Sequence, residues 1–170
     1  MKYGQTAISE QMTFLGEEHT TKPKQARIPV YRVTLVREGK MPTYESRIRS
    51  SATAHTVLQE YLDGVDREHF VVMLLDQKNQ AIGLHTVSIG SLTASIVAPR
   101  EVFKVAILAN CANILLAHNH PSGDPQPSKE DRAITQRLKE AGALLGINVL
   151  DHLVIGAEGR YFSFADENLL

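Results

Sequence analysis

The chain has 170 residues, of which 43% are hydrophobic and 22% are charged, a composition typical of one globular domain rather than of a largely disordered chain. Its formal net charge of -1 and its lack of Trp give no support for general polyanion binding or for an aromatic platform that stacks bases. The single cysteine, Cys111, excludes an intramolecular disulfide and a Cys-x-x-Cys zinc site, so histidines and carboxylates must hold any metal.

The first residues contain no apolar segment of the kind found in signal peptides, and no apolar stretch elsewhere is long enough to span a membrane. We therefore expect a cytoplasmic protein without a membrane partner. Residues 1–27 are polar and end in the basic run TKPKQAR, which predicts a flexible N-terminal arm. Residues 28–170 are expected to form one domain.

Charge is unevenly distributed along the chain. Residues 1–60 carry nine Lys and Arg and six Asp and Glu, a balance of +3, whereas residues 61–170 have a balance of −4. Two interpretations are open. The cations of the first third lie on an ordinary solvated surface, or they form a face that contacts phosphates.

The first half of the chain predicts strands around one helix. Residues 28–39 alternate between apolar and polar side chains and are rich in β-branched residues, which is typical of a strand. Residues 50–64 begin with serines that can cap a helix and end at a glycine, so they predict a short amphipathic helix. Residues 68–76 are almost continuously apolar, as in a central strand buried on both faces, and two further strands are expected at residues 81–90 and 92–98.

The second half predicts two helices and three strands. Residues 99–111 open with a proline, which is favoured in the first turn of a helix, and residues 113–118 form another apolar strand. Residues 128–146 have apolar side chains at helical spacing and end at a glycine. Residues 147–156 and 160–165 predict the last two strands. Because strands alternate with helices but also form hairpins, the expected fold class is mixed α/β, with a partly antiparallel sheet between helices.

The most informative segment is HNHPSGDPQPSKED, residues 118–131. His118 and His120 are two positions apart where a buried strand ends, and alternate residues of a strand point to one face, so both imidazoles can reach one point. Three prolines and a glycine then impose a compact loop, after which Asp131 returns toward the histidines. Two imidazoles and a carboxylate suit Zn²⁺ in catalytic sites, where a fourth position stays open to water.

The same residues also admit a structural interpretation. Ser128, followed three residues later by Asp131, matches a helix capping box, in which the serine is the N-cap and an acidic side chain lies in the first turn. The two interpretations are compatible, because a cap that fixes the Asp131 carboxylate would also orient it as a ligand.

A zinc hydrolase needs a base that takes a proton from the attacking water. Glu68 precedes an apolar run, so its carboxylate is expected at the end of the sheet; the alternative is an ordinary solvated charge. Other histidine motifs are excluded by spacing. The letters HNH are adjacent rather than dispersed as in HNH nucleases, the cysteine pair of a deaminase is missing, Ser122 stands where a metallo-β-lactamase motif has Asp, and HExxH is absent.

His118-x-His120, seven further residues, Ser128, two residues and Asp131 resemble the JAMM (JAB/MPN+) zinc metalloprotease motif. The wording HNHPSGDPQPSKED, preceded by GSLTASIVAPREVF and followed by LDHLVIG, is more narrowly similar to the bacterial RadC family, whose members are often called DNA repair proteins. The resemblance implies a curved, cytidine-deaminase-like mixed β-sheet flanked by helices. It also implies that His118, His120 and Asp131 bind Zn²⁺, that Glu68 is the base, and that Ser128 donates a hydrogen bond to the oxyanion.

The N-terminal third departs from the RadC pattern. RadC proteins usually carry a helix-hairpin-helix module there, and residues 1–60 show no matching pair of helices, which weakens the inference of DNA binding. Two functions are considered. The first is a hydrolase of amide bonds with a peptide or protein substrate. The second is a nucleic-acid-associated DNA repair or plasmid accessory protein in which zinc is structural or vestigial. The sequence does not indicate an oligomeric state.

Three further residues are expected to be structural. His152, in the pair Asp151-His152, is expected to make a hydrogen bond behind the site or in the core rather than to bind metal. Asp124 is expected to hold a turn of the loop, and Cys111 is expected to be a small core residue.

Overall fold

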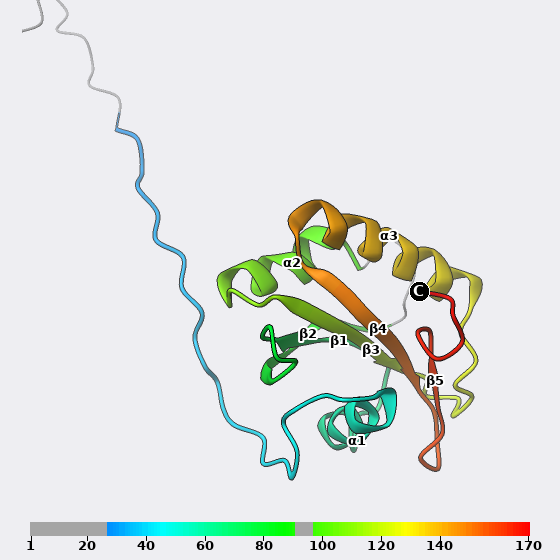
Figure 1. Ribbon diagram of the computed structural model, residues 1–170. Helices are drawn as coiled ribbons and strands as arrows, with labels where there is room; N and C mark the ends of the chain where they lie inside the picture. The colour runs from blue at the N-terminus through cyan, green and yellow to red at the C-terminus, as the bar shows by residue number, and fades with distance from the viewer. Residues whose placement is uncertain (1–26, 91–96) are drawn as a thin grey trace, which may run out of the picture. The chain divides into compact units, whose positions relative to one another are not determined.

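The computed structural model describes residues 27–90 and 97–170 of the chain (Figure 1). The chain divides into two compact units, Met1–Val33 and Thr34–Leu170. In the first unit, the described residues are extended and exposed; the second unit contains the described helices and strands. The expected N-terminal arm lies outside the described residues except for Arg27, and so do residues 92–96 of the expected strand 92–98.

The second unit is built around a five-stranded β-sheet with the strand order β2-β1-β3-β4-β5. The strands are β1 (His69–Leu75), β2 (Ala81–Ile89), β3 (Asn113–Asn119), β4 (Asn148–Ile155) and β5 (Tyr161–Ser163), and the helices are α1 (Ser51–Tyr61), α2 (Pro99–Leu108) and α3 (Lys129–Leu145). Neighbouring strands are antiparallel except for β3 and β4, which are parallel. Parallel strands need a crossover connection, and α3 provides it.

The central strands β1 and β3 are buried on both faces, as their apolar runs predict. On one face Phe70, Val72 and Leu116 belong to the same core as residues of α2 and α3. On the other face Val71 and Met73 pack in a second core with α1. Figure 1 shows α2 and α3 on one side of the sheet and α1 on the other. This arrangement confirms the predicted mixed α/β class.

The helix ends follow from the residues that flank them. Ser50 caps α1, because its side chain accepts a hydrogen bond from Thr53 N. Helix α3 starts after Ser128 and stops at Gly146, whose φ of 69° is the left-handed conformation that glycine adopts easily. Among the described helices, none combines the length and the hydropathy of a membrane-spanning segment.

The strand predicted at residues 28–39 is wrong, because these residues form no strand. Their apolar side chains are exposed: Val30 is 96% exposed and Val36 is 82% exposed. A strand is stable only when a neighbouring strand satisfies its backbone groups, and alternation in the sequence does not supply that neighbour. Further along the chain, Arg47 forms an isolated bridge with Gln80, the residue before β2.

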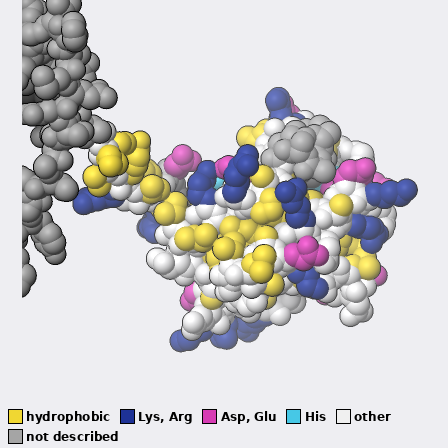
Figure 2. Space-filling model, turned by 90° about the horizontal axis from the view of Figure 1, so that it is seen from above, with side chains coloured by type: hydrophobic (Ala, Val, Ile, Leu, Met, Phe, Trp, Pro, Cys, Tyr) yellow, Lys and Arg dark blue, Asp and Glu magenta, His cyan; other side chains and the backbone are white. Residues whose placement is uncertain are grey.

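Charged side chains form several separate groups on the face that Figure 2 shows, interspersed with hydrophobic and neutral side chains. Exposed neighbours of opposite sign form short contacts, such as Arg67 with Asp66 at 2.7 Å and Lys104 with Glu101 at 2.6 Å. Such surface pairs contribute little to stability. The mixture of charged, hydrophobic and neutral side chains in Figure 2 is the pattern of an ordinary solvated surface.

The loop after β3 is fixed by the turn between β4 and β5. His120 N donates to Ile155 O at 2.9 Å, and Arg160 Nη2 donates to Gly123 O at 3.1 Å. Gly156 permits this close approach, because a Cβ at that position would lie 2.7 Å from Gly123 O. The loop that follows His120 thus rests directly on the hairpin.

We predict that Gly156→Ala displaces this loop, because the added methyl group would also lie 3.0 Å from Pro125 Cδ. Overpacking of this kind lowers the free energy of unfolding by about 1–3 kcal/mol, which chemical denaturation measures. Faster hydrogen exchange at Gly123 N, which donates to His120 O at 2.9 Å, would report the displaced loop.

Gly159→Ala is the matched control in the same turn. Gly159 has a φ of +71°, and a Cβ added there would have no atom within 4 Å. The substitution therefore strains the backbone without touching the loop. Exchange at Gly123 should stay at the wild-type rate in this control. Equal exchange rates in the two variants would contradict the proposed contact.

Candidate metal centre

Four side chains from three parts of the chain meet at one end of the sheet. His118 lies near the end of β3, His120 directly follows that strand, Asp131 lies in the first turn of α3, and Glu68 directly precedes β1. One potential ligand atom of each lies within 4.8 Å of the others. His118 and Asp131 are 0% and 2% exposed, whereas His120 and Glu68 are half-buried. The cluster therefore has a dry side and an accessible side.

The two imidazoles and the carboxylate face one another. His118 Nε2 lies 3.0 Å from His120 Nε2 and 3.4 Å from Asp131 Oδ1. His120 Nε2 lies 3.6 Å from Asp131 Oδ2. Two atoms that each lie about 2.0–2.2 Å from one tetrahedral ion are about 3.3–3.6 Å apart. The two distances to Asp131 fall in this range and the distance between the imidazoles is slightly shorter, so a small shift would let one small cation bind all three side chains.

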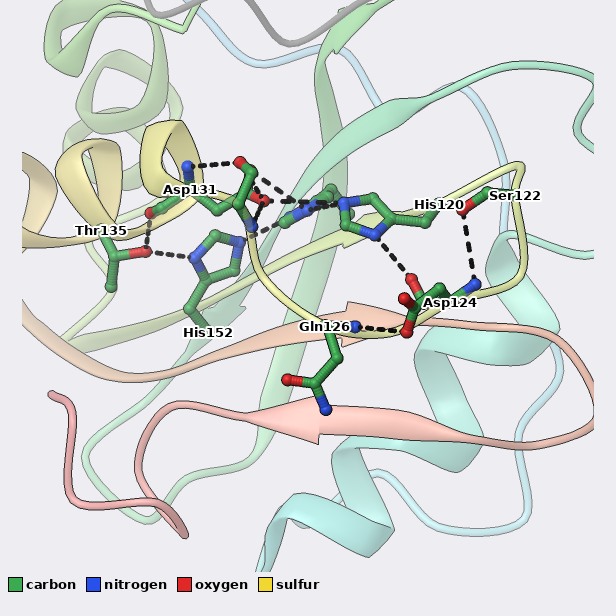
Figure 3. A network of polar contacts seen from close by, with 9 residues as sticks. His120, Ser122, Asp124, Gln126, Asp131, Thr135 and His152 are labelled. Atoms are coloured by element: carbon green, nitrogen blue, oxygen red, sulfur yellow. Dashed lines mark hydrogen bonds and ion pairs between the residues drawn. The ribbon is translucent and has the colours of Figure 1, made fainter.

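The hydrogen bond behind His120 determines which of its nitrogens faces the cluster. Its Nδ1 lies 2.7 Å from the backbone O of Asp124, and because a carbonyl only accepts, Nδ1 carries the hydrogen (Figure 3). The Nε2 of the neutral ring is then a bare acceptor. The Asp124 carboxylate itself accepts from Gln126 N at 3.1 Å, which confirms that Asp124 holds a turn of the loop.

A bare imidazole nitrogen and a carboxylate oxygen repel each other unless a positive charge lies between them. Without a metal ion a proton can supply it: the hydrogen bond to Asp131 raises the pKa of His120, although burial opposes the shift. Burial alone would raise the pKa of Asp131, but the neighbouring imidazoles of His118 and His120 hold this pKa well below its ordinary value. The carboxylate therefore stays charged, and the group fits a cation.

Ser128 orients the Asp131 carboxylate from the start of α3. The Ser128 backbone N and hydroxyl donate to Asp131 Oδ2 at 2.7 and 2.6 Å, and Ser128 Oγ accepts from Asp131 N at 3.0 Å. This is the capping box that the spacing predicts. Because Oδ1 of the same carboxylate faces His118, the helix cap and the cluster share one side chain.

Asn119 supports the site in a way that the sequence alone does not indicate. Its Oδ1 accepts from His69 N at 2.8 Å and its Nδ2 donates to Arg67 O at 2.9 Å, so one amide holds the backbone on both sides of Glu68. Gly90 N also donates to Glu68 O, at 2.8 Å. The sequence signal that could have pointed to Asn119 is its position between two clustered histidines.

Two further residues, His152 and Cys111, have the structural surroundings that the sequence predicts. His152 is 0% exposed and lies within hydrogen-bond distance of His118 and Thr135. Cys111 is 7% exposed, and burial raises the pKa of its thiol. In the described part of the chain, no second group of three or more His, Cys, Asp and Glu side chains is placed to share a metal ion.

This geometry agrees with what known proteins share with the chain. A family model described as the RadC-like JAB domain matches residues 48–169, which include every strand and all four clustered side chains. The chain belongs to the RadC-like JAB domain family. The match confirms the family resemblance indicated by the segment from His118 to Asp131.

The chain is similar to proteins named UPF0758 in several organisms. A UPF0758 protein of Rubrobacter xylanophilus is 51% identical over 123 residues, which are 72% of this chain and 53% of that protein. A UPF0758 protein of Desulforamulus reducens is 50% identical over 114 residues, 67% of this chain and 50% of that protein. A UPF0758 protein of Methanosarcina mazei is 48% identical over 124 residues, 73% of this chain and 54% of that protein. The chain spans about half the length of the curated relatives it matches.

We predict that metal binding by this RadC-like JAB domain weakens as the pH falls. A ligating imidazole must be neutral, and the pKa of His120 is raised above its ordinary value of 6.5, so protons compete with the metal from a higher pH than usual. Below that pKa the affinity should fall by about tenfold per pH unit for one displaced proton. Titration with Zn²⁺ over a series of pH values measures this. A constant affinity across the histidine range would contradict binding through the imidazoles.

Proposed function

We propose that the protein is a zinc-dependent hydrolase of amide bonds, with a peptide or isopeptide bond of a protein as substrate. The observation that carries the proposal is the convergence of His118, His120, Asp131 and Glu68, with ligand atoms within 4.8 Å of one another. Membership of the RadC-like JAB family supports a metal-dependent hydrolase in general terms. The resemblance of the motif to JAMM metalloproteases supports zinc and an amide substrate.

We assign the two imidazoles and the Asp131 carboxylate as zinc ligands. Three protein ligands are typical of catalytic rather than structural zinc sites. A zinc ion held there would supply a Lewis acid that polarises a carbonyl and lowers the pKa of water. His118 and Asp131 would hold it from the dry side. The half-buried His120 and Glu68 lie at the side from which a substrate can enter.

We assign Glu68 as the general base. Its carboxylate lies within 4.8 Å of the ligand atoms, so it can reach a proton on a water molecule among them. Because Asn119 holds the backbone on both sides of Glu68, this base is positioned before the substrate arrives. During hydrolysis Glu68 would take a proton from the attacking water and return it to the leaving amine, while the C–N bond breaks and a C–O bond forms.

We assign Ser128 as the donor to the carbonyl oxygen on which negative charge develops. In the substrate-free protein its hydroxyl donates to Asp131 Oδ2 at 2.6 Å. It would therefore have to turn from the carboxylate toward the substrate. The second contact of Ser128 with Asp131, through the backbone N at 2.7 Å, would keep the carboxylate oriented while the hydroxyl turns.

We predict that Glu68→Gln abolishes hydrolysis but leaves zinc bound. Gln has the size of Glu but cannot accept a proton in the reaction, and general acid–base catalysis contributes about 10²–10⁴-fold to the rate. Cleavage of a fluorogenic peptide library by the zinc-loaded chain measures activity, and calorimetry measures zinc affinity. The control Glu130→Gln removes an exposed carboxylate in the first turn of α3, outside the cluster, and should cleave at the wild-type rate.

Two outcomes would contradict the assignment of Glu68. Cleavage by Glu68→Gln at the rate of Glu130→Gln would show that Glu68 is not the base. Loss of zinc binding in Glu68→Gln with retention in Glu130→Gln would make Glu68 a ligand instead.

A second candidate function, association with nucleic acid, is favoured by one separate feature. Arg47, Arg49 and Lys78 line a hollow of about 460 Å³ together with Ile48 and Asn79. The side chains of the three cations are exposed, whereas Ile48 is 7% exposed. The hollow therefore offers positive charge rather than apolar surface, unlike the mostly apolar pockets that hold small molecules.

The backbone that carries two of these cations is fixed. Ile48 N donates to Asn79 O at 2.9 Å, so the segment of Arg47 and Arg49 is anchored at the turn between β1 and β2. Arg49 also lies 3.5 Å from Glu45, but this pair is exposed and of small energetic weight. Guanidinium groups bind phosphates through paired hydrogen bonds, so the hollow suits the backbone of a nucleic acid.

We predict that the double variant Arg47→Glu, Lys78→Glu weakens binding of duplex DNA. The logarithm of the binding constant falls linearly with the logarithm of the salt concentration. Each lost phosphate contact should make this negative slope shallower by about 0.9. Fluorescence anisotropy at several salt concentrations measures that slope. Lys139→Glu reverses one exposed charge on α3 and serves as the control. Equal slopes for the wild type and both variants would exclude this candidate.

A further inference from the structure

A chain of buried hydrogen bonds continues behind His118, away from the cluster. His118 Nδ1 lies 2.8 Å from His152 Nε2, and His152 Nδ1 lies 2.6 Å from Thr135 Oγ1. Thr135 Oγ1 in turn donates to the backbone O of Asp131 at 2.5 Å. Figure 3 shows His152 between the cluster and Thr135 of α3. His152 is 0% exposed and Thr135 is 2% exposed, so water does not compete for these contacts.

The last acceptor in this series of hydrogen bonds determines which atom carries each hydrogen. The carbonyl of Asp131 can only accept, so the single hydroxyl hydrogen of Thr135 points to it. Thr135 Oγ1 must then accept from His152 Nδ1. A neutral imidazole carries one N–H, so His152 Nε2 is bare and accepts from His118 Nδ1. His118 in its neutral form is left with a bare Nε2, the atom that faces His120 and Asp131.

The surroundings of His152 favour this neutral, fixed ring. The ring is fully buried, and burial disfavours the charged form of an imidazole. The ring stacks on Phe164 with centroids 5.1 Å apart, and the edge contact with Phe70 is 5.4 Å between centroids. These contacts restrict rotation of the imidazole, so both of its hydrogen bonds keep their directions.

We propose that His152 and Thr135 are positioning residues of the metal centre: they hold His118 in the one neutral form whose Nε2 is free to bind the metal. The chain of contacts closes on itself, because Asp131 contributes its carboxylate in front of His118 and its backbone carbonyl at the far end. The inference rests on the proposed metal centre but not on the proposed hydrolysis, so metal affinity tests it without a substrate.

The alternative is that His152 is a core histidine without influence on the metal. In that case its loss would lower the stability of the metal-free protein and leave the affinity of the folded protein unchanged. A positioning role predicts the opposite signature, since a fixed hydrogen bond behind a ligand increases metal affinity.

The test measures zinc affinity of the full chain by competition with a chelator in four variants. His152→Phe removes both hydrogen bonds but keeps a ring between Phe70 and Phe164, and should weaken zinc binding by about 10–100-fold. His152→Gln can accept from His118 and donate to Thr135, and should recover most of the loss. Thr135→Val has nearly the shape of Thr without the hydroxyl and should weaken binding, whereas Thr135→Ser keeps the hydroxyl and should bind as the wild type.

Denaturation of the metal-free variants and nitrogen chemical shifts of His118 complete the test. The expected result is that metal-free His118 carries its hydrogen on Nδ1 in the wild type and mixes its two neutral forms in His152→Phe. If His152→Phe does not fold, the comparison of zinc affinity between Thr135→Val and Thr135→Ser tests the inference instead. Wild-type affinity in folded His152→Phe or in Thr135→Val would overturn this inference alone. Absence of zinc binding by the wild type would overturn the metal centre itself, and this inference with it.

Discussion

Burial of the Asp131 carboxylate is the constraint on which the site depends. A charged group that is 2% exposed is costly unless it is paired and hydrogen-bonded. Ser128 supplies two donors to one of its oxygens, and the imidazoles of His118 and His120 lie 3.4 and 3.6 Å from the carboxylate. The start of α3, the loop before it and the end of β3 must therefore assemble together, since each one satisfies part of the same buried charge.

The two histidines share a target but differ in what lies behind them. His118 is enclosed and is backed by another imidazole, whereas His120 lies at the accessible side and is backed by the carbonyl of Asp124. In both cases a hydrogen bond at Nδ1 leaves Nε2 directed at the carboxylate. The sheet makes this possible because the apolar parts of β1 and β3 fill the two cores and leave polar residues to the strand ends.

Much of the fold could be predicted because its signals are local. Continuous apolar runs marked β1 and β3, helical spacing with Ser128 and Gly146 at the ends marked α3, and the order of elements indicated a mixed α/β class. The segment 28–39 has an equally clear strand pattern and forms no strand. Its pattern describes which side chains could share a face, but a strand also needs a partner for its backbone, and that partner is a property of the whole fold.

The same distinction holds at the site. The sequence by itself determined which residues can form the site. Spacing alone puts His118 and His120 on one face of a strand and places Ser128 where it can cap the helix of Asp131. Only the tertiary structure decided that Glu68, fifty residues before His118, lies beside them, and that Asn119, His152 and Thr135 hold the backbone and the rings in place. The physical reason is that these contacts join separate strands and a helix, and hydrogen bonds between distant parts of a chain leave no periodic trace in its sequence.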